Sequence, residues 1–229
     1  MGIPVKTVLE LSCAAYRING YYTRDDVWEY DQNGNATKHV LANKQMMKNC
    51  IESGDFSEIT DLDREKADCL VEHFRKHYLF RMLSGQLSDF AKQLSKLAIS
   101  ESLIDPDGKD RGQYHIKIGM LAYAPAMYDR DQTEFRLSDT GRANGQIDLP
   151  VRSRIAGKFE CMQIFNSRDM FSDSKLHKGL LDNRYAVRFW TSKPFEENQT
   201  YNITARIKGF DNNKVFTSLN YVRIVEDTQ

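Results

Sequence analysis

The stretch that decides the fold runs from residue 183 to residue 225 and reads NRYAVRFWTS, KPFEENQ, TYNITARIKGFDNN and KVFTSLNYVRIV. Apolar and polar residues alternate along most of it, and short turn-forming segments interrupt the alternation. Successive side chains of a β-strand point to opposite faces of a sheet, so this alternation predicts strands. We therefore expect three strands joined by tight turns.

Each of the first two strands has one apolar face and one face that mixes cations with a large aromatic ring. In the first strand these faces are Tyr185, Val187 and Phe189 against Arg184, Arg188 and Trp190. In the second they are Tyr201, Ile203, Ala205 and Ile207 against Arg206, Lys208 and Phe210. Cations attract phosphates and flat rings stack on unpaired bases, so the mixed faces are typical of a single-strand nucleic-acid platform. A solvated face whose aromatic rings are covered by a loop or another domain explains the same pattern.

Charge is balanced overall but is distributed unevenly along the chain. The 229 residues contain 32 Lys plus Arg and 32 Asp plus Glu. Residues 1–110 contain 14 basic and 18 acidic residues, and residues 111–229 contain 18 and 14, so the halves carry about −4 and +4. Residues 151–225 contain 13 basic and 7 acidic residues, which predicts salt-sensitive nucleic-acid binding of moderate strength.

The cysteines and the N-terminal sequence indicate a cytoplasmic protein. Cys13, Cys50, Cys69 and Cys161 are widely spaced and form no CxxC pair, which favours reduced thiols. We expect no signal peptide, because MGIPVKT lacks a basic and then apolar leader. No apolar run approaches the length of a membrane span, so we expect no membrane partner.

Helical spacing of apolar residues dominates the first part of the chain. We expect helices over residues 5–19, 39–52, 60–83 and 86–104, and these apolar stripes predict the core of a helical bundle. Asn33-Gly34 fits either a hairpin tip or a loop, and we favour a loop because the segment after it is polar.

The turn-forming segment Asp105–Asp110 marks the expected domain boundary. After it, HIKIGMLAYA (residues 115–124) and RIAGKFECMQIFNS (154–167) are predicted to be strands, with Gly157 as a bulge. Residues 129–151 are predicted to form a long loop, and residues 168–183 a partly helical excursion. With the three strands after residue 183, this part has five predicted strands.

No motif in the chain specifies a reaction. GxSxG, HExxH and GxxxxGK[ST] are all missing from the sequence. Cys69, His73 and His77 recur every four residues on one predicted helix, but three such steps drift around a helix, so we expect no metal site and no cofactor. We expect a non-enzymatic protein, although a catalytic site assembled from scattered residues, for example in the 129–151 loop, stays an alternative.

The β-rich part resembles the OB-fold, a five-stranded Greek-key barrel. The resemblance covers about 70 residues and rests on FEENQTYNITARIKGFDNNKVFTSLNYVRIV (residues 195–225), which is similar to the last two strands of OB domains in replication and recombination proteins. It implies oligonucleotide or oligosaccharide binding. The positions that match the binding face are Lys158, Arg184, Arg188, Trp190, Arg206, Lys208 and Phe210.

The sequence therefore predicts an α+β protein with a helical domain over residues 1–105 and a mostly antiparallel, OB-like β-barrel domain over residues 113–229. We expect a nucleic-acid-binding accessory protein, with single-stranded DNA as partner, of the kind found in phage or bacterial DNA replication or recombination. The alternative is a protein–protein adaptor, in which the face of the β-domain docks the helical domain or a partner such as a polymerase, and the helices carry an assembly interface. If the protein is viral, its cytoplasmic location is the host's.

Overall fold

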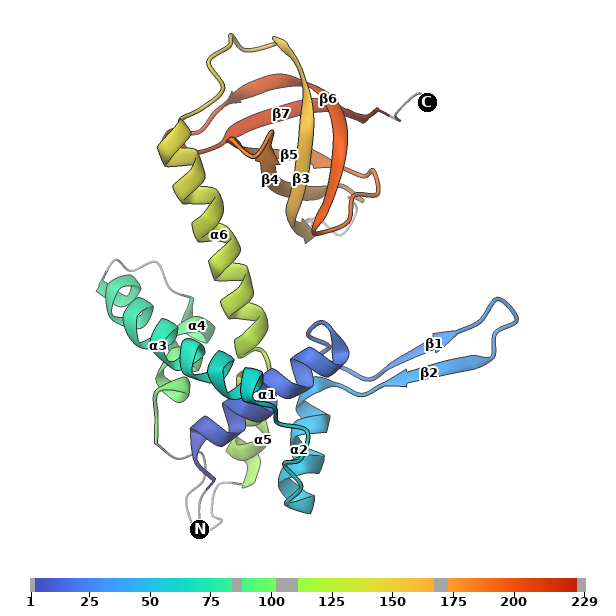
Figure 1. Ribbon diagram of the computed structural model, residues 1–229, viewed down its shortest axis with the longest axis vertical. Coiled ribbons are helices and arrows are strands. Elements are labelled where there is room, and N and C mark those ends of the chain that lie inside the picture. Colours follow the sequence, from blue (N-terminus) through green and yellow to red (C-terminus); the bar gives the residue numbers. More distant parts are fainter. Residues whose placement is uncertain (1–2, 84–87, 102–110, 167–172, 226–229) are drawn as a thin grey trace. The chain divides into compact units, whose positions relative to one another are not determined.

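The protein has an N-terminal group of helices followed by a closed β-barrel (Figure 1). The computed structural model describes residues 3–83, 88–101, 111–166 and 173–225. The chain divides into two compact units, Met1–Asp129 and Arg130–Gln229. The sequence placed this division at residues 105–110, which lie outside the described residues. The fold is α+β, as predicted.

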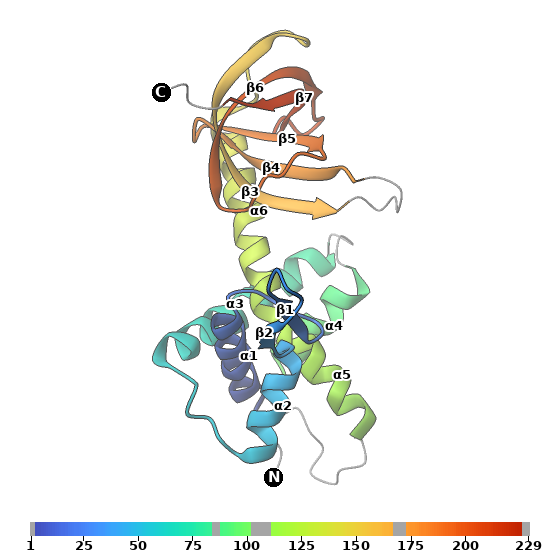
Figure 2. The ribbon, with the colours of Figure 1, turned by 90° about the vertical axis from the view of Figure 1, so that its right-hand side faces the viewer.

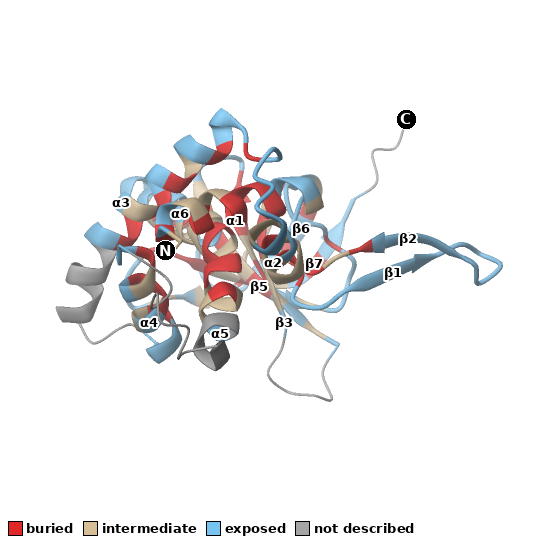
Figure 3. Ribbon diagram, turned by 90° about the horizontal axis from the view of Figure 1, so that it is seen from below, coloured by how far each residue is buried: buried red, intermediate tan, exposed pale blue. Residues whose placement is uncertain are grey.

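The helical unit contains α1 (Val5–Asn19), α2 (Asn43–Ser53), α3 (Asp61–Leu83), α4 (Asp89–Ala98) and α5 (Arg111–Ala122). Its core, coloured as buried in Figure 3, includes side chains from all five helices, for example Leu9, Met47, Leu70, Leu94 and Leu121. The α1 helix ends where predicted, because Gly20 adopts the left-handed conformation with φ of 76°. The predicted helical bundle core is therefore confirmed.

A β-hairpin interrupts the helices where we favoured a loop, so that interpretation is wrong. Strands β1 (Val27–Tyr30) and β2 (Ala36–Val40) pair antiparallel, and the Asp31 carboxylate accepts hydrogen bonds from the amides of Asn33 and Asn35 at 2.8 Å in the turn. The indole of Trp28 stacks on the His39 ring with 4.0 Å between centroids. This cross-strand stack substitutes for the apolar alternation that the polar second arm lacks.

Two segments predicted as strand and loop are helices. The α5 helix contains most of HIKIGMLAYA, and α6 (Ala124–Asn144) contains most of the predicted 129–151 loop. In α5 the buried residues Ile118, Leu121 and Ala122 are three and four residues apart, whereas Ile116 is 65% exposed. The helical spacing therefore determines the structure, and the short alternation at residues 115–118 was misleading.

The barrel contains β3 (Arg154–Asn166), β4 (Lys175–Leu181), β5 (Tyr185–Thr191), β6 (Gln199–Phe210) and β7 (Thr217–Ile224), seen from two sides in Figures 1 and 2. Its strand order is β3-β4-β5-β7-β6, and β6 pairs with β3 to close it. All pairs are antiparallel except β5 with β7. This arrangement is compatible with an OB-like fold.

The sequence predicted five strands, as the barrel has, but one of the five was placed in the wrong segment. The segment predicted as a helical excursion contains β4, which replaces the strand expected at residues 115–124. Gly157 is not a bulge, because β3 keeps a continuous register with β6 through this residue. The register of β3 shifts instead against β4, between Cys161 and Gln163.

The barrel has apolar contacts both inside and outside. Its interior holds Phe159, Val187, Phe189, Ile203 and Ile207, among others. Outside, the α6 residue Leu137 packs with one residue each of β3, β4 and β5, namely Met162, Leu180 and Ala186. Ion pairs from Glu134 to Lys178 at 2.8 Å and from Arg136 to Glu160 at 3.2 Å flank this contact. The α6 helix therefore covers part of the outer face of these three strands.

Gly179 allows β4 to pass close to β3. A Cβ atom at this position would overlap the backbone oxygen of Glu160 and lie 2.7 Å from a ring carbon of Phe159. We expect Gly179→Ala to lower the free energy of unfolding of the barrel by about 3 kcal/mol or more, because backbone and a buried ring must both shift. Urea denaturation followed by Trp190 fluorescence in a Trp28→Phe background measures this. Gly209→Ala is the matched control, since a Cβ there meets no atom within 4 Å; an equal loss of stability in both variants would contradict the prediction.

His177 is buried in the barrel core with an exposed fraction of 1%. Its ring stacks on Phe189 at 5.4 Å and contacts Phe195 at 5.2 Å. Nδ1 lies 2.9 Å from the carbonyl oxygen of Lys175, and Nε2 has no hydrogen-bond partner within the described structure. Burial lowers the pKa of His177 from its ordinary value of 6.5, and the contact with the Lys175 carbonyl only partly opposes this effect.

The lowered pKa makes the stability of the barrel depend on pH. The unfolded chain binds a proton at a higher pH than the folded barrel, so the stabilisation is complete above the ordinary pKa of 6.5 and is lost as pH falls below it. We expect the free energy of unfolding to fall between about pH 7 and pH 5, and His177→Phe to flatten this slope. Urea titrations at several pH values check both, and an unchanged slope in His177→Phe would assign the dependence to other groups.

Candidate nucleic-acid interface

In β5 and β6, the residues predicted for the apolar face point into the barrel, and those predicted for the cationic, aromatic face lie on the outside. Val187 and Phe189 are buried inside the barrel, whereas Trp190 is 53% exposed. On β6, Ile203, Ala205 and Ile207 are buried, and Arg206, Lys208 and Phe210 are exposed. The period of two in the sequence therefore separated the core from the surface of these strands correctly.

Four of the seven predicted site residues surround one hollow on the barrel surface. The hollow measures about 460 Å³, and its lining includes Arg188, Trp190, Lys208 and Phe210. We call it the aromatic hollow. Its two rings and two cations come from β5 and β6, and β7, which pairs with both strands, contributes Ser218 and Asn220 to the lining. Because β7 pairs with both strands, the side chains of β5 and β6 lie on either side of it.

The polar groups of the aromatic hollow are positioned but not neutralised. Arg188 donates a hydrogen bond from Nε to Ser218 Oγ at 3.2 Å, and its guanidinium lies 5.7 Å from the centre of the Phe216 ring. The lining residues that the structure describes include neither Asp nor Glu. Within the described ranges, neither Arg188 nor Lys208 forms an ion pair. The hollow can therefore offer its positive charge to an external anion.

The other three predicted residues lie outside the aromatic hollow. Arg184 belongs to the turn between β4 and β5, where its guanidinium lies 5.0 Å from the centre of the Tyr185 ring. Lys158 lines a smaller hollow together with the carboxylate residues Glu160 and Asp182. Two carboxylates beside one lysine make this hollow a poor place for a phosphate. Arg206 lines a separate hollow.

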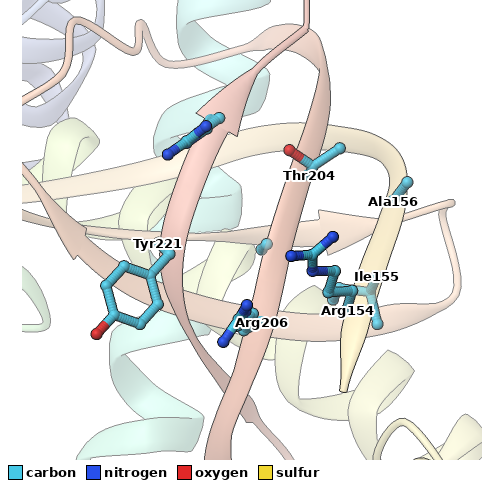
Figure 4. Close-up of a pocket in the computed structure, with 8 residues that line it drawn as sticks. Arg154, Ile155, Ala156, Thr204, Arg206 and Tyr221 are labelled. Atoms are coloured by element: carbon cyan, nitrogen blue, oxygen red, sulfur yellow. The ribbon is translucent and has the colours of Figure 1, made fainter. Parts of the chain in front are cut away.

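The hollow around Arg206 contains residues that the sequence analysis missed. It measures about 590 Å³, and Figure 4 shows its lining on β3, β6 and β7, which includes Arg154, Arg206, Tyr221 and Arg223. We call it the arginine hollow. Alternation in the sequence did carry a signal, since Tyr221 and Arg223 flank the buried Val222. The pairing of Arg154 with Arg206, however, depends on closure of the barrel, which no local pattern reveals.

The described residues include no group of three or more His, Cys, Asp or Glu side chains that could hold a metal ion. Cys69 is exposed, whereas His73 is buried with edge-on ring contacts to Phe74 and Tyr128. The side chain of His77 lies outside the described part of the structure. Among the described helices, none is both long and apolar enough to cross a membrane.

The fold belongs to the class of closed five-stranded, OB-like barrels. The aromatic and arginine hollows give the surface of this barrel exposed rings and cations. Comparisons of the chain with protein-family models, with curated proteins and with solved structures found no match. The geometry of this surface is therefore the basis on which a function can be inferred.

Neighbouring residues 189 and 190 provide a direct test of the face assignment. Phe189 is 2% exposed, so Phe189→Ala should cost about 3–5 kcal/mol of barrel stability. Trp190 is 53% exposed, so Trp190→Ala should cost less than about 1 kcal/mol. Urea denaturation followed by far-UV circular dichroism compares the two variants. A larger loss of stability in Trp190→Ala than in Phe189→Ala would reverse the assignment.

Proposed function

We propose that the barrel binds single-stranded nucleic acid, with DNA as the leading partner, through the aromatic hollow. The observation that carries this proposal is the convergence of Trp190, Phe210, Arg188 and Lys208 on one hollow from two strands that are separated in the barrel by β7. Exposed rings offer π-surfaces to unstacked bases, and unpaired cations attract the phosphates between those bases. The protein acts without catalysing a reaction.

The position of α6 supports the choice of this face. Part of the outer surface of β3, β4 and β5 is covered by α6. The end of β5, together with β6 and β7, leaves rings and cations exposed on the outside of the barrel.

A setting in phage or bacterial DNA replication or recombination follows from the resemblance to OB domains and belongs to the same proposal.

Removal of Trp190 should weaken binding while the barrel stays folded. Stacking contributes about 1–3 kcal/mol per base, so Trp190→Ala should weaken binding to a labelled oligothymidine of about 30 nucleotides by about tenfold or more. Fluorescence anisotropy at low and moderate salt measures the affinity. Quenching of Trp190 emission in a Trp28→Phe background reports stacking directly, because these are the two tryptophans of the chain.

Tyr30→Ala is the matched control for this titration. Tyr30 is 63% exposed and lies on the β1–β2 hairpin of the helical unit, so its replacement removes an exposed ring but leaves the barrel intact. We expect wild-type affinity in this variant. If wild-type protein fails to bind the oligonucleotide at low salt, the proposal is wrong.

A protein–protein adaptor is the second candidate, and the β1–β2 hairpin favours it. Val27, Trp28 and Tyr30 are all exposed there, and within the described residues β1 and β2 pair only with each other. Open strand edges beside apolar side chains are a template for adding a strand of another protein. This function predicts no salt-dependent affinity for nucleic acid, together with a stable complex that a pull-down recovers and Trp28→Ala disrupts.

A further inference from the structure

We propose that the arginine hollow is a phosphate-binding subsite, in which Arg154, Arg206 and Arg223 hold backbone phosphates of a strand whose bases stack in the aromatic hollow. The continuous path of that strand rests on the proposed function. The affinity of the three guanidinium groups for phosphate does not rest on it.

The register of the barrel places like charges side by side. Arg154 of β3 is the direct partner of Arg206 on β6, and both side chains are exposed on the outer face. Arg223 of β7 is the partner of Thr204, two residues before Arg206. Like charges directly opposite each other on neighbouring strands repel, so this arrangement costs stability unless an anion lies between them.

No carboxylate among the described residues neutralises the three arginines. The described lining residues of the arginine hollow include neither Asp nor Glu, and none of the three arginines forms an ion pair with another described residue. By contrast, Arg17, Arg64, Arg136 and Arg142 each pair with a carboxylate within 4 Å. The planar, forked guanidinium suits bidentate binding of phosphate oxygens, so an external phosphate is the ligand that fits this unpaired cluster best.

A bulge in β7 adds an aromatic ring to this cluster. The register of β6 against β7 shifts between Thr204 and Arg206, and Tyr221 adopts a φ of 52° there. A non-glycine residue with positive φ is uncommon, and bulges of this kind redirect a side chain. Tyr221 is 75% exposed, with its ring centre 6.0 Å from the guanidinium of Arg206. The bulge thus places a stacking surface next to the arginines.

The two hollows adjoin along the same strands. On β7, Asn220 lines the aromatic hollow and Tyr221 lines the arginine hollow. On β6, Lys208 lines the former and Arg206 the latter. From Ser218 to Arg223 the chain extends about 16 Å at the usual rise of a strand, so one oligonucleotide of a few nucleotides can occupy both hollows.

The test compares an oligothymidine of about 12 nucleotides with an abasic strand of equal length, which keeps the phosphates and lacks the bases. We expect the triple variant Arg154→Gln, Arg206→Gln and Arg223→Gln to bind both strands about tenfold or more weakly. Log affinity falls with log salt, and in the triple variant this fall should be less steep by about 2. Each phosphate that is no longer neutralised reduces the steepness by about 0.7. Trp190→Ala should weaken binding of the oligothymidine but not of the abasic strand. It should leave the salt slope unchanged.

Arg142→Gln is the matched control for the single variant Arg206→Gln, because it removes one positive charge from the same unit at an arginine that is paired with Asp139. It should change the slope little. A melting temperature at least as high as that of wild type shows that the triple variant is folded, and Arg206→Lys should keep the salt slope that Arg206→Gln lowers. A strand with an added 5′-phosphate shows whether the hollow binds terminal or internal phosphates. If the added group raises the affinity and this gain needs the three arginines, the hollow binds a terminal phosphate. If the affinity does not rise, the hollow binds internal phosphates.

The outcomes separate this inference from the proposed function. Wild-type affinity and slope in the triple variant would overturn the arginine subsite, even if Trp190→Ala confirmed the aromatic hollow. Equal binding of both strands, reduced by the triple variant and unaffected by Trp190→Ala, would support the subsite and overturn stacking. Failure of wild-type protein to bind either strand at low salt would overturn both.

Discussion

The hydrogen-bonded ladder between β3 and β6 closes the barrel, and both the core and the surface hollows depend on it. Its register runs without interruption from Arg154 opposite Arg206 to Cys161 opposite Gln199. This register directs Phe159 and Ile203 inward and leaves Arg154 and Arg206 on the outside. A slip by one residue would exchange the two faces, so the buried apolar set and the exposed cationic set are fixed by the same pairing.

The inside and the outside of the barrel make different demands on the same strands. Inside, Phe159, Phe189 and Phe195 pack against one another, and Phe189 and Phe195 also contact His177. The desolvation of that histidine favours its neutral form. Outside, positive charges gather in the aromatic and arginine hollows, whose described lining residues include no carboxylate. Removal of charge from the core and accumulation of charge on the surface both follow from the alternation of side chains along each strand.

Local periodicity predicted the last three strands, and it predicted the faces of β5 and β6. In β6 the burial of a side chain follows its parity in the sequence, and in β5 the exception is Ala186, which packs in the cluster with Leu137 of α6. The same reasoning failed for α6, whose polar sequence reads as a loop. Few residues of this helix need to be apolar, since its contact with the barrel centres on Leu137, and Gly141 permits close approach to Val215.

The arginine hollow was missed for a different reason. Arg154 and Arg223 are 69 residues apart, and only closure of the barrel brings their strands to the same β6 neighbour.

The cover that α6 provides determines which surface of the barrel is available for binding. Lys178 points out from β4, yet Glu134 of α6 neutralises it at 2.8 Å, and Arg136 of α6 likewise pairs with Glu160 of β3. Charges on this side are satisfied within the protein, whereas Arg188, Lys208 and Arg206 have no such partner among the described residues. Because free charge attracts an anionic polymer and paired charge does not, the proposed attraction would act on the surface formed by β6, β7, Arg188 of β5 and Arg154 of β3. The same surface exposes Trp190, Phe210 and Tyr221, the rings on which the bases of the proposed nucleic-acid partner would stack.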